Sequence, residues 1–313
     1  MSRRISTQKA GLLACLLLST LFSPLALAKF ITVAGNKADN FQNQLLSGIE
    51  QAVDGRGDES YMDVANGDFA RQLEQIRQYV KTGTDAIIIV STTRDPKQVQ
   101  QIIDVSANKP LVFVNQEPLA DLNKLPKHTA YVGSNEKDSG TMEMEELARL
   151  ANYQGKVALL IGEPKHSAAI MRTQDVKDVI AKYPKMKLVT SEVANWNRNE
   201  AYQITKKWLS SKLDFNILVA NNDEMIIGAI LAMQDAGVDP KKYLTGGVDA
   251  TQDALRLMAQ GDLSVTVLQD AAKQGTTAVD VTYQLIQGEP TSPTYWVPFR
   301  LVTPQNYQQY LVK

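Results

Sequence analysis

The chain has 313 residues, enough for two domains and a large core, and its 44% hydrophobic and 21% charged content is ordinary for a globular protein. Its formal net charge of −1 argues against a nucleic-acid binder, which would carry a strongly basic surface. Its single cysteine, Cys15, excludes a disulfide framework and a cysteine-based metal site.

The N-terminal segment has the pattern of a secretory signal peptide. Three basic residues within 3–9 precede an apolar run over 11–22, and small residues at 26–28 suit cleavage after the last of them. The apolar run is too short to span a bilayer. A lipoprotein signal ending at Cys15 is the alternative, but cleavage there would leave most of the apolar run on the chain. We expect an exported protein of residues 29–313, with a formal net charge of −4 once the three basic residues are removed.

Strands and helices alternate along the first part of this mature chain. Apolar runs predict strands, and apolar residues spaced three and four apart predict helices. The expected strands are 30–34, 60–65, 86–90 and 111–114, and the expected helices lie around 45–49, over 68–82 and around 99–103. This alternation implies parallel strands with right-handed crossovers.

The same pattern starts again at 131–133. Strands are expected over 157–161, 187–193, 215–220, 244–248 and 265–268, and a final extended segment over 295–302. Helices are expected over 142–151, 167–183, 200–210, 223–236, 251–260 and 271–287. Two successive sets of this unit predict an α/β protein with two lobes.

Four of the expected strands end abruptly in polar residues. The residues that follow them are Asn115 and Gln116, then Asn221 and Asn222, then Asp249, then Gln269. In open parallel sheets ligands bind beyond the carboxyl ends of the strands, so these amides and carboxylates are candidates to face a bound molecule. Capping of the following helix is the alternative role for each of them.

Several stretches of the chain resemble a known protein family. They are 221–229, 247–251, 267–270 and 297–304. Together they are similar to the periplasmic sugar-binding proteins of ABC importers, the ribose-binding type, and the resemblance covers the whole mature chain. Four further stretches, 125–127, 131–136, 171–173 and 194–198, are most similar to the inositol and rhizopine binders within that family.

The resemblance implies two doubly wound parallel-sheet lobes on either side of a cleft, joined by a three-segment hinge. Applied to this sequence, it predicts a signal peptide at 1–28, an N-terminal lobe of 29–132 plus 270–297, and a C-terminal lobe of 133–269 plus 298–313. The helix expected at 271–287 would then return to the first lobe.

The ligand class predicts which side chains the cleft needs. A polyol has hydroxyls around its rim and C–H groups on its faces, so it needs hydrogen-bonding groups in its plane and aromatic surfaces above and below. Phe41 and Trp196 are the candidate surfaces, and packing at the start of a helix is the alternative for Phe41. Asp249 and Arg172 are the charged candidates. Arg172 matches the family's binding arginine, and its alternative is a surface position on helix 167–183.

The remaining candidates are polar. Asn222 and Gln269 match ligand-binding amides of the family, with helix capping and bridging of the hinge as their alternatives. Asn115 and Gln116 stand where ribose binders carry an Asp-Arg pair, and this departure argues against ribose. Asp39 is a further candidate.

One more departure lies in the loop that opens the first lobe. Gln42 replaces the second of two adjacent phenylalanines found in ribose binders, which suits a ligand with hydroxyls on every ring carbon. Lys37 is also a candidate for the cleft, although it is equally well explained as a solvated side chain.

These features predict a monomeric binding protein without cofactor or metal, which captures a cyclitol or monosaccharide and delivers it to an ABC permease in the inner membrane. Inositol is the best candidate, another pentose, hexose or polyol is the alternative, and presentation to a chemoreceptor is possible in addition. A sugar-responsive repressor would need a DNA-reading domain where the signal peptide stands. A glycosidase using Asp249 and Glu224 is disfavoured because Glu224 falls in the first turn of a helix, where the dipole favours a carboxylate.

Overall fold

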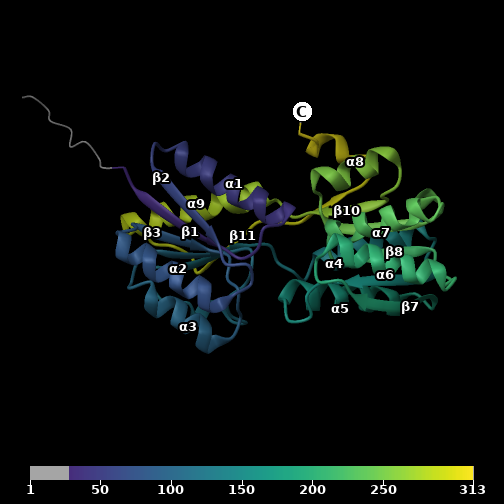
Figure 1. The fold of residues 1–313 in the computed structure, drawn as a ribbon, viewed down its shortest axis with the longest axis horizontal. Helices are drawn as coiled ribbons and strands as arrows, with labels where there is room; N and C mark the ends of the chain where they lie inside the picture. The colour runs from purple at the N-terminus through teal and green to yellow at the C-terminus, as the bar shows by residue number, and fades with distance from the viewer. Residues whose placement is uncertain (1–27, 313) are drawn as a thin grey trace, which may run out of the picture.

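The computed structural model describes residues 28–312, which form two lobes, each built on one six-stranded sheet (Figure 1). The first sheet contains β1 (Phe30–Gly35), β2 (Glu59–Val64), β3 (Ala86–Ile89), β4 (Leu111–Val114), β5 (Thr129–Gly133) and β11 (Thr294–Trp296). Its helices are α1 (Asn40–Asp54), α2 (Phe69–Thr82), α3 (Pro96–Val105) and α9 (Ala271–Gln287). The predicted signal peptide lies outside the described residues, apart from its last position.

The second lobe has the same plan. Its strands are β6 (Gln154–Ile161), β7 (Lys185–Val193), β8 (Ile217–Ala220), β9 (Leu244–Asp249), β10 (Val265–Leu268) and β12 (Arg300–Val302). Its helices are α4 (Ser139–Leu150), α5 (Ser167–Lys182), α6 (Arg198–Ser210), α7 (Asp223–Asp235) and α8 (Gln252–Gln260). Short 3₁₀ helices, η1 (Leu122–Lys124), η2 (Pro240–Lys242) and η3 (Tyr307–Tyr310), complete the described elements.

The strand order is β11-β5-β4-β3-β1-β2 in the first sheet and β12-β10-β9-β8-β6-β7 in the second. All pairs are parallel except β10 with β12, which is antiparallel. The predicted α/β class with two mainly parallel sheets is therefore confirmed. Among the described residues, no helix is long and apolar enough to cross a membrane.

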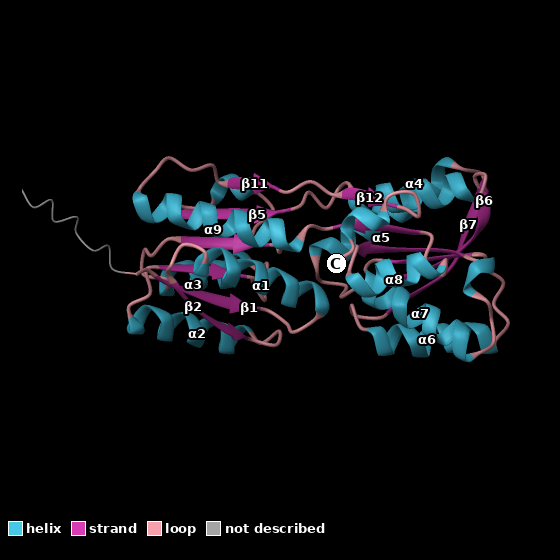
Figure 2. Ribbon diagram, turned by 90° about the horizontal axis from the view of Figure 1, so that it is seen from above, coloured by secondary structure: helices cyan, strands magenta, loops and turns pink. Residues whose placement is uncertain are grey.

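The chain passes between the sheets three times. It leaves the first sheet after β5, returns after β10 to form α9 and β11, and crosses again to β12 (Figure 2). The segment expected to be extended over 295–302 contains two short strands, β11 and β12, which pair with different sheets. Pro298 lies between them and has no N–H for a ladder hydrogen bond. The exact lobe boundaries predicted from the sequence stay a proposal.

The helix α9 is held against α1 by two glycines. A Cβ atom on Gly275 would lie 2.8 Å from the carbonyl oxygen of Leu45, and one on Gly48 would lie 3.1 Å from the Cα of Ala272. The backbones of the two helices therefore approach more closely than any larger side chain would allow. This contact joins the last described α-helix of the chain, which follows the helices of the second lobe in sequence, to the first helix of the first lobe.

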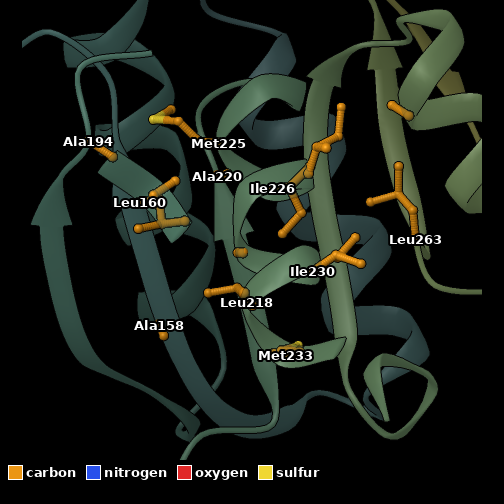
Figure 3. Packing of buried hydrophobic residues seen from close by; sticks show 14 of the residues in the cluster. Ala158, Leu160, Ala194, Leu218, Ala220, Met225, Ile226, Ile230, Met233 and Leu263 are labelled. Carbon is orange, nitrogen blue, oxygen red and sulfur yellow. The ribbon is translucent and has the colours of Figure 1, made fainter. Parts of the chain in front are cut away.

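Helices on both faces of each sheet explain why the central strands are apolar without interruption. In the second lobe, Leu160 and Leu218 of neighbouring strands pack against Ile226, Ile230 and Met233 on one face of α7 (Figure 3). All five side chains are fully buried, and each contributes about 1.5–3 kcal/mol through removal from water. The strand ends that follow are consequently rigid supports for polar side chains.

Candidate functional site

A cavity lies between the two lobes, beyond the carboxyl ends of strands from both sheets. The space between its lining atoms is about 630 Å³, counting its open mouth. The lining residues are Asn36, Lys37, Asp39, Phe41, Gln42, Asn115, Glu136, Glu163, His166, Ala168, Arg172, Trp196, Asn222, Glu224, Asp249 and Gln269. Nine of the ten predicted site residues are therefore brought together, and their contact with a ligand stays a prediction.

Gln116 is the predicted residue that the structure does not place in the cavity lining. Its side chain is buried, and its Oε1 accepts a hydrogen bond from Nδ2 of Asn36 at 3.5 Å. Asn115, which does line the cavity, has a left-handed backbone with φ 66° directly after β4. The left-handed backbone of Asn115 ends the extended strand, and only the first of the two amides lines the cavity.

Arg172 is the centre of a buried network rather than a surface residue. Its Nε and Nη2 donate to the two carboxylate oxygens of Glu136 at 2.9 and 3.0 Å, and only 3% of the Arg172 side chain is exposed. Its other donors reach the carbonyl oxygen of Asn221 at 2.8 Å and Oε1 of Gln269 at 3.2 Å. Burial alone would lower the pKa of Arg172, but the charges of Glu136 and Asp249 outweigh burial and raise it.

This network ties the two hinge crossings to the second lobe. Glu136 follows β5 on the first crossing, and Gln269 follows β10 on the second. Nε2 of Gln269 also donates to Oε1 of Glu136 at 3.4 Å, so the three side chains form a closed triangle. Arg172 therefore both faces the cavity and fixes the connection between the lobes.

Asp249 combines burial with an unusual backbone. It lies at the end of β9 with φ 129°, and the next residue, Ala250, has φ 54°. Such conformations are costly for residues other than glycine and are concentrated at functional sites. The Asp249 carboxylate accepts no hydrogen bond from the described residues, and burial raises its pKa well above the usual value against the opposing charge of Arg172. It is a buried acceptor without a partner at the cavity wall.

Two aromatic side chains enter the cavity from opposite lobes. Trp196 follows β7 with a left-handed backbone, φ 64°, and Phe41 belongs to the first turn of α1. The indole lies directly over the end of β6, because a Cβ atom on Gly162 would come within 2.4 Å of Trp196 Cη2. Phe41 also packs against the core of its own lobe, so its alternative role as a packing residue holds as well.

Some polar side chains of the first lobe have acceptor atoms without a hydrogen-bond partner. Asp39 caps α1 by accepting from the backbone N–H of Gln42 at 2.7 Å, and burial raises the Asp39 pKa. Nε2 of Gln42 donates to Oδ1 of Asn115 at 3.5 Å, while Oε1 of Gln42 and Oδ1 of Asn36 are buried without a partner. A buried polar atom without a partner costs about 1–3 kcal/mol, which a ligand hydroxyl would offset.

In the second lobe, Asn222 caps α7. Its Oδ1 accepts from the backbone N–H of Met225 at 3.1 Å, so the capping role is present while the residue also lines the cavity. The capping role does not consume the two N–H donors of the same amide. Among the described residues, no group of three or more histidine, cysteine, aspartate or glutamate side chains could hold a metal ion.

The lobes already touch at the mouth of the cavity. Nδ2 of Asn40 donates to Oε1 of Glu224 at 2.6 Å, and Lys37 forms an ion pair with Glu163. Glu224 is also held by Arg198, which donates to both of its oxygens at 2.9 Å. The carboxylate considered as a hydrolase partner of Asp249 is thus fully engaged in structural contacts.

Sequence reasoning missed several lining residues. They are Asn36, Glu136, Glu163, His166 and Ala168. Asn36 could have been found from its position directly after the first strand. Glu163 likewise lies two residues after the end of the expected strand 157–161. Glu136, His166 and Ala168 lie in loops or at the start of a helix, and the pairing of Glu136 with Arg172 is visible only in the structure.

Comparison with known proteins gives three consistent findings. A family model described as "Periplasmic binding protein domain" matches residues 30–290. A protein of Rhizobium meliloti named "Putative rhizopine-binding protein" is 38% identical over 275 residues, which covers 87% of this chain and 89% of that protein. The crystal structure of an ABC transporter solute-binding protein from Bacillus halodurans with bound myo-inositol has a TM-score of 0.83 and 32% identity, covering 90% of this chain and 96% of the other.

A more distant structure has the same fold. The Caulobacter myo-inositol binding protein matches with a TM-score of 0.80 and 20% identity, covering 90% of this chain and 95% of that one. At this identity the likeness concerns the arrangement of the two lobes.

Proposed function

The chain belongs to the periplasmic binding protein family, of the sugar-binding type I class, and from this premise we propose that it captures a cyclitol between its lobes, with myo-inositol the best candidate. Membership of a binding-protein family confirms that the chain is not an enzyme. In the proposed role the protein works in the periplasm and hands its ligand to an ABC permease. The predicted signal peptide supports this location.

The observation that carries the proposal is the distribution of cavity groups over both lobes. Aromatic side chains come from opposite lobes, with Phe41 on one side and Trp196 on the other. Acceptors without partners surround the cavity, among them Oε1 of Gln42 and Oδ1 of Asn36, and the side chain of Asp249 lines the same cavity. A small polyhydroxylated ring supplies O–H donors around its rim and C–H surfaces on its faces, and so matches this arrangement.

The choice of a cyclitol rests on the relatives and on one substitution in the cavity. The similar protein of Rhizobium meliloti bears a rhizopine-binding name, and the similar Bacillus halodurans structure contains myo-inositol. Gln42 places an amide where ribose binders have an aromatic ring, and the structure leaves its Oε1 without a partner. An added hydrogen-bonding group favours a ring with a hydroxyl at every carbon.

Closure of the lobes follows from contacts that only the closed form makes. A ligand shifts a conformational equilibrium only through a difference in its affinity for the two states. A ring held by Asp249 and Trp196 of one lobe and by Gln42 of the other binds the closed form more tightly than the open form. No single lobe offers all three side chains. Asn40 with Glu224 and Lys37 with Glu163 add ligand-independent contacts to the closed form.

A thermal-shift screen of the purified protein against pentoses, hexoses and cyclitols tests the proposal. A ligand that binds only the folded state at 100 times its Kd stabilises that state by about 2.7 kcal/mol, so a binder raises Tm in a concentration-dependent way. We expect the largest shift with myo-inositol or a close relative. Stabilisation by ribose or galactose without any effect of inositol would refute the ligand assignment and leave the family assignment intact.

A further inference from the structure

The first residue of the expected mature chain is held by a carboxylate of the first lobe. The backbone N–H of Lys29 donates to Oδ1 of Asp58 at 2.7 Å, in a partly buried contact directly before β1. The other oxygen of Asp58, Oδ2, accepts from the hydroxyl of Tyr283 on α9. These residues lie at the end of the first lobe that points away from the second lobe, so they are separate from the cavity between the lobes (Figure 1).

The two hydrogen bonds of Asp58 do not serve its own loop. Asp58 lies between the turn that follows α1 and the start of β2, where an aspartate commonly bonds to a backbone N–H two residues further on. The partners that its side chain has among the described residues are instead 29 and 225 positions away in the sequence. The carboxylate therefore links the beginning of β1 to the last described α-helix.

The surroundings of Asp58 keep it ionised. Burial alone would raise the pKa of its carboxyl group, but the hydrogen bonds from Tyr283 and Lys29, together with the charges of Lys29 and Arg56, outweigh burial and lower that pKa. The two cationic side chains lie against the ring of Tyr283, with Nζ of Lys29 5.2 Å and Cζ of Arg56 4.7 Å from its centroid. Arg56 is also paired with Asp280. At neutral pH an anion thus lies 2.7 Å from the backbone nitrogen of Lys29.

The sequence places an expected processing site at the same nitrogen. Small residues at 26 and 28 suit a signal peptidase, which would hydrolyse the peptide bond between Ala28 and Lys29. Hydrolysis consumes one water, leaves a carboxylate on Ala28 and converts the amide nitrogen of Lys29 into an α-ammonium group. A peptide N–H is a single neutral donor, whereas an ammonium has three donors and a full charge, so the existing contact becomes an ion pair.

We propose that Asp58 is the binding site for the α-ammonium group that removal of the signal peptide creates on Lys29. Two independent observations, the cleavage pattern of the sequence and the hydrogen bond of the structure, point to the same atom. Because Tyr283 holds the second oxygen of Asp58, the ion pair fastens the mature N-terminus to α9 as well as to the start of β2. The inference concerns maturation of the chain and does not depend on the identity of the ligand.

The first measurement is the N-terminal residue of the exported protein. The full chain is expressed in a bacterium that has a periplasm, and the periplasmic product is analysed by N-terminal sequencing and intact mass. We expect a chain that begins at Lys29. A chain that begins at any other residue would overturn the inference, because the new ammonium group would then lie away from Asp58.

Two purified proteins that differ only at the N-terminus test the ion pair itself. One begins at Lys29 after removal of a fusion partner, and the other carries a short serine-glycine extension before Ala28, so that its Lys29 nitrogen stays an amide. At pH 7 we expect the first protein to melt about 2–4 °C higher, the shift that one charge-assisted contact gives in a chain of this length. Asp58→Asn should abolish this difference in Tm, because an amide carries no counter-charge. A difference that persists in Asp58→Asn would overturn the inference.

Asp85 offers a matched control. Its Oδ2 accepts from the backbone N–H of Phe30 at 2.8 Å, one residue further along the chain, and this nitrogen is an amide in both proteins. Asp85→Asn should therefore lower both melting temperatures and leave the difference between them in place. Loss of the difference in Asp85→Asn as well would show that Asp58 has no specific role.

The pH dependence of the two wild-type proteins tests the ion pair without any substitution. An α-amine ordinarily titrates near about pH 8, and pairing with a carboxylate shifts this titration upward in the folded state. The added stability is then fully present below about pH 8 and is lost as the pH rises above it. Both proteins contain the other charged or titratable groups of this region, which therefore cancel in the difference: the Lys29 side chain, Arg56, Glu59, Asp85, Asp280 and Tyr283. We expect the difference in Tm to narrow between pH 7 and pH 10, and a constant difference would overturn the inference.

Discussion

Replacement of Glu136 by glutamine should destabilise the protein strongly, because it breaks a buried ion pair without changing shape. Glu136 and Arg172 form two parallel hydrogen bonds of 2.9 and 3.0 Å, and their side chains are 7% and 3% exposed. Glutamine can accept one of these hydrogen bonds but cannot neutralise the guanidinium. The Glu136→Gln variant therefore keeps a buried cation that has lost its main counter-charge.

The expected loss follows from the price of an unpaired buried charge. Removal of one partner from a buried ion pair costs about 3–5 kcal/mol. Two features place Glu136→Gln near the lower end of that range, at about 3 kcal/mol: Gln269 still accepts from Arg172, and the charge of Asp249 also acts on the guanidinium.

A second arginine–glutamate pair of similar geometry offers a matched control. Arg149 donates to both oxygens of Glu146 at 2.7 Å, but 58% of the Arg149 side chain is exposed. Solvent screens such a pair, so Glu146→Gln should destabilise the protein far less than Glu136→Gln. Urea unfolding of wild type and both variants, followed by far-ultraviolet circular dichroism, measures the two differences under one set of conditions.

The comparison is decisive in either direction. Equal destabilisation by Glu136→Gln and Glu146→Gln, or a loss below about 1 kcal/mol for Glu136→Gln, would show that burial of the first pair does not have the cost assigned to it. A further expectation is weaker ligand binding in Glu136→Gln alone, since only that pair lines the cavity.

Three further predictions concern the cavity and the fold of the second lobe. Trp196→Ala and Asp249→Ala should each weaken binding of the ligand found in the screen, the latter by about 1.5–3 kcal/mol, with a cooperative melt retained; unchanged affinity in both would remove the proposed site. Gly162→Ala should weaken binding nearly as much as Trp196→Ala in calorimetric titrations, because its Cβ would displace the indole; wild-type affinity would show that the indole position is not needed. Burial raises the pKa of Asp175 to about 6, so the stability from its protonated form is present below the unfolded-state pKa of about 4 and is lost as pH rises through 6. The Tm advantage of Asp175→Asn over wild type should accordingly grow between pH 4 and pH 7, and a constant difference in melts across that range would contradict the assignment.

The elements of the fold were predictable where one local signal dominates. The strand expected over 111–114 and the helix over 271–287 have the observed bounds, because an apolar run and an apolar stripe identify them without tertiary information. Helix α4 begins three residues earlier than expected, since its first turn is held by the surrounding structure and carries few apolar residues. The local pattern alone gives 295–302 as one extended segment, because pairing with two different sheets leaves no mark in it. The lobe boundary expected between 297 and 298 came from the family resemblance.

The site residues, too, were predictable only where the local sequence carries a signal. Asn115, Asn222, Asp249 and Gln269 were identifiable because each lies at the end of a strand or within two residues after it, and strand ends of a parallel sheet converge. Arg172 was found through the family resemblance, since a lone arginine on a helix carries no signal of burial.

His166 and Glu136 were beyond reach of the sequence for a physical reason. The position of each depends on a partner that folding brings from elsewhere: the histidine contacts the ring of Trp196 edge to face, and the glutamate pairs with Arg172. Such pairings arise from the packing of the second lobe and its hinge, which periodicity does not encode.

The close contact of α9 with α1 governs the order in which the molecule can be assembled. The two helices are separated along the chain by residues 55–270, so the first lobe lacks one wall and its edge strand β11 until that whole stretch has been placed. A fragment ending at residue 268 would contain every strand of the second sheet except β12, yet it would expose the face of α1 that Gly48 shapes for its partner. The lobe that begins the polypeptide is thus completed only near its end, and truncation late in the sequence damages its beginning.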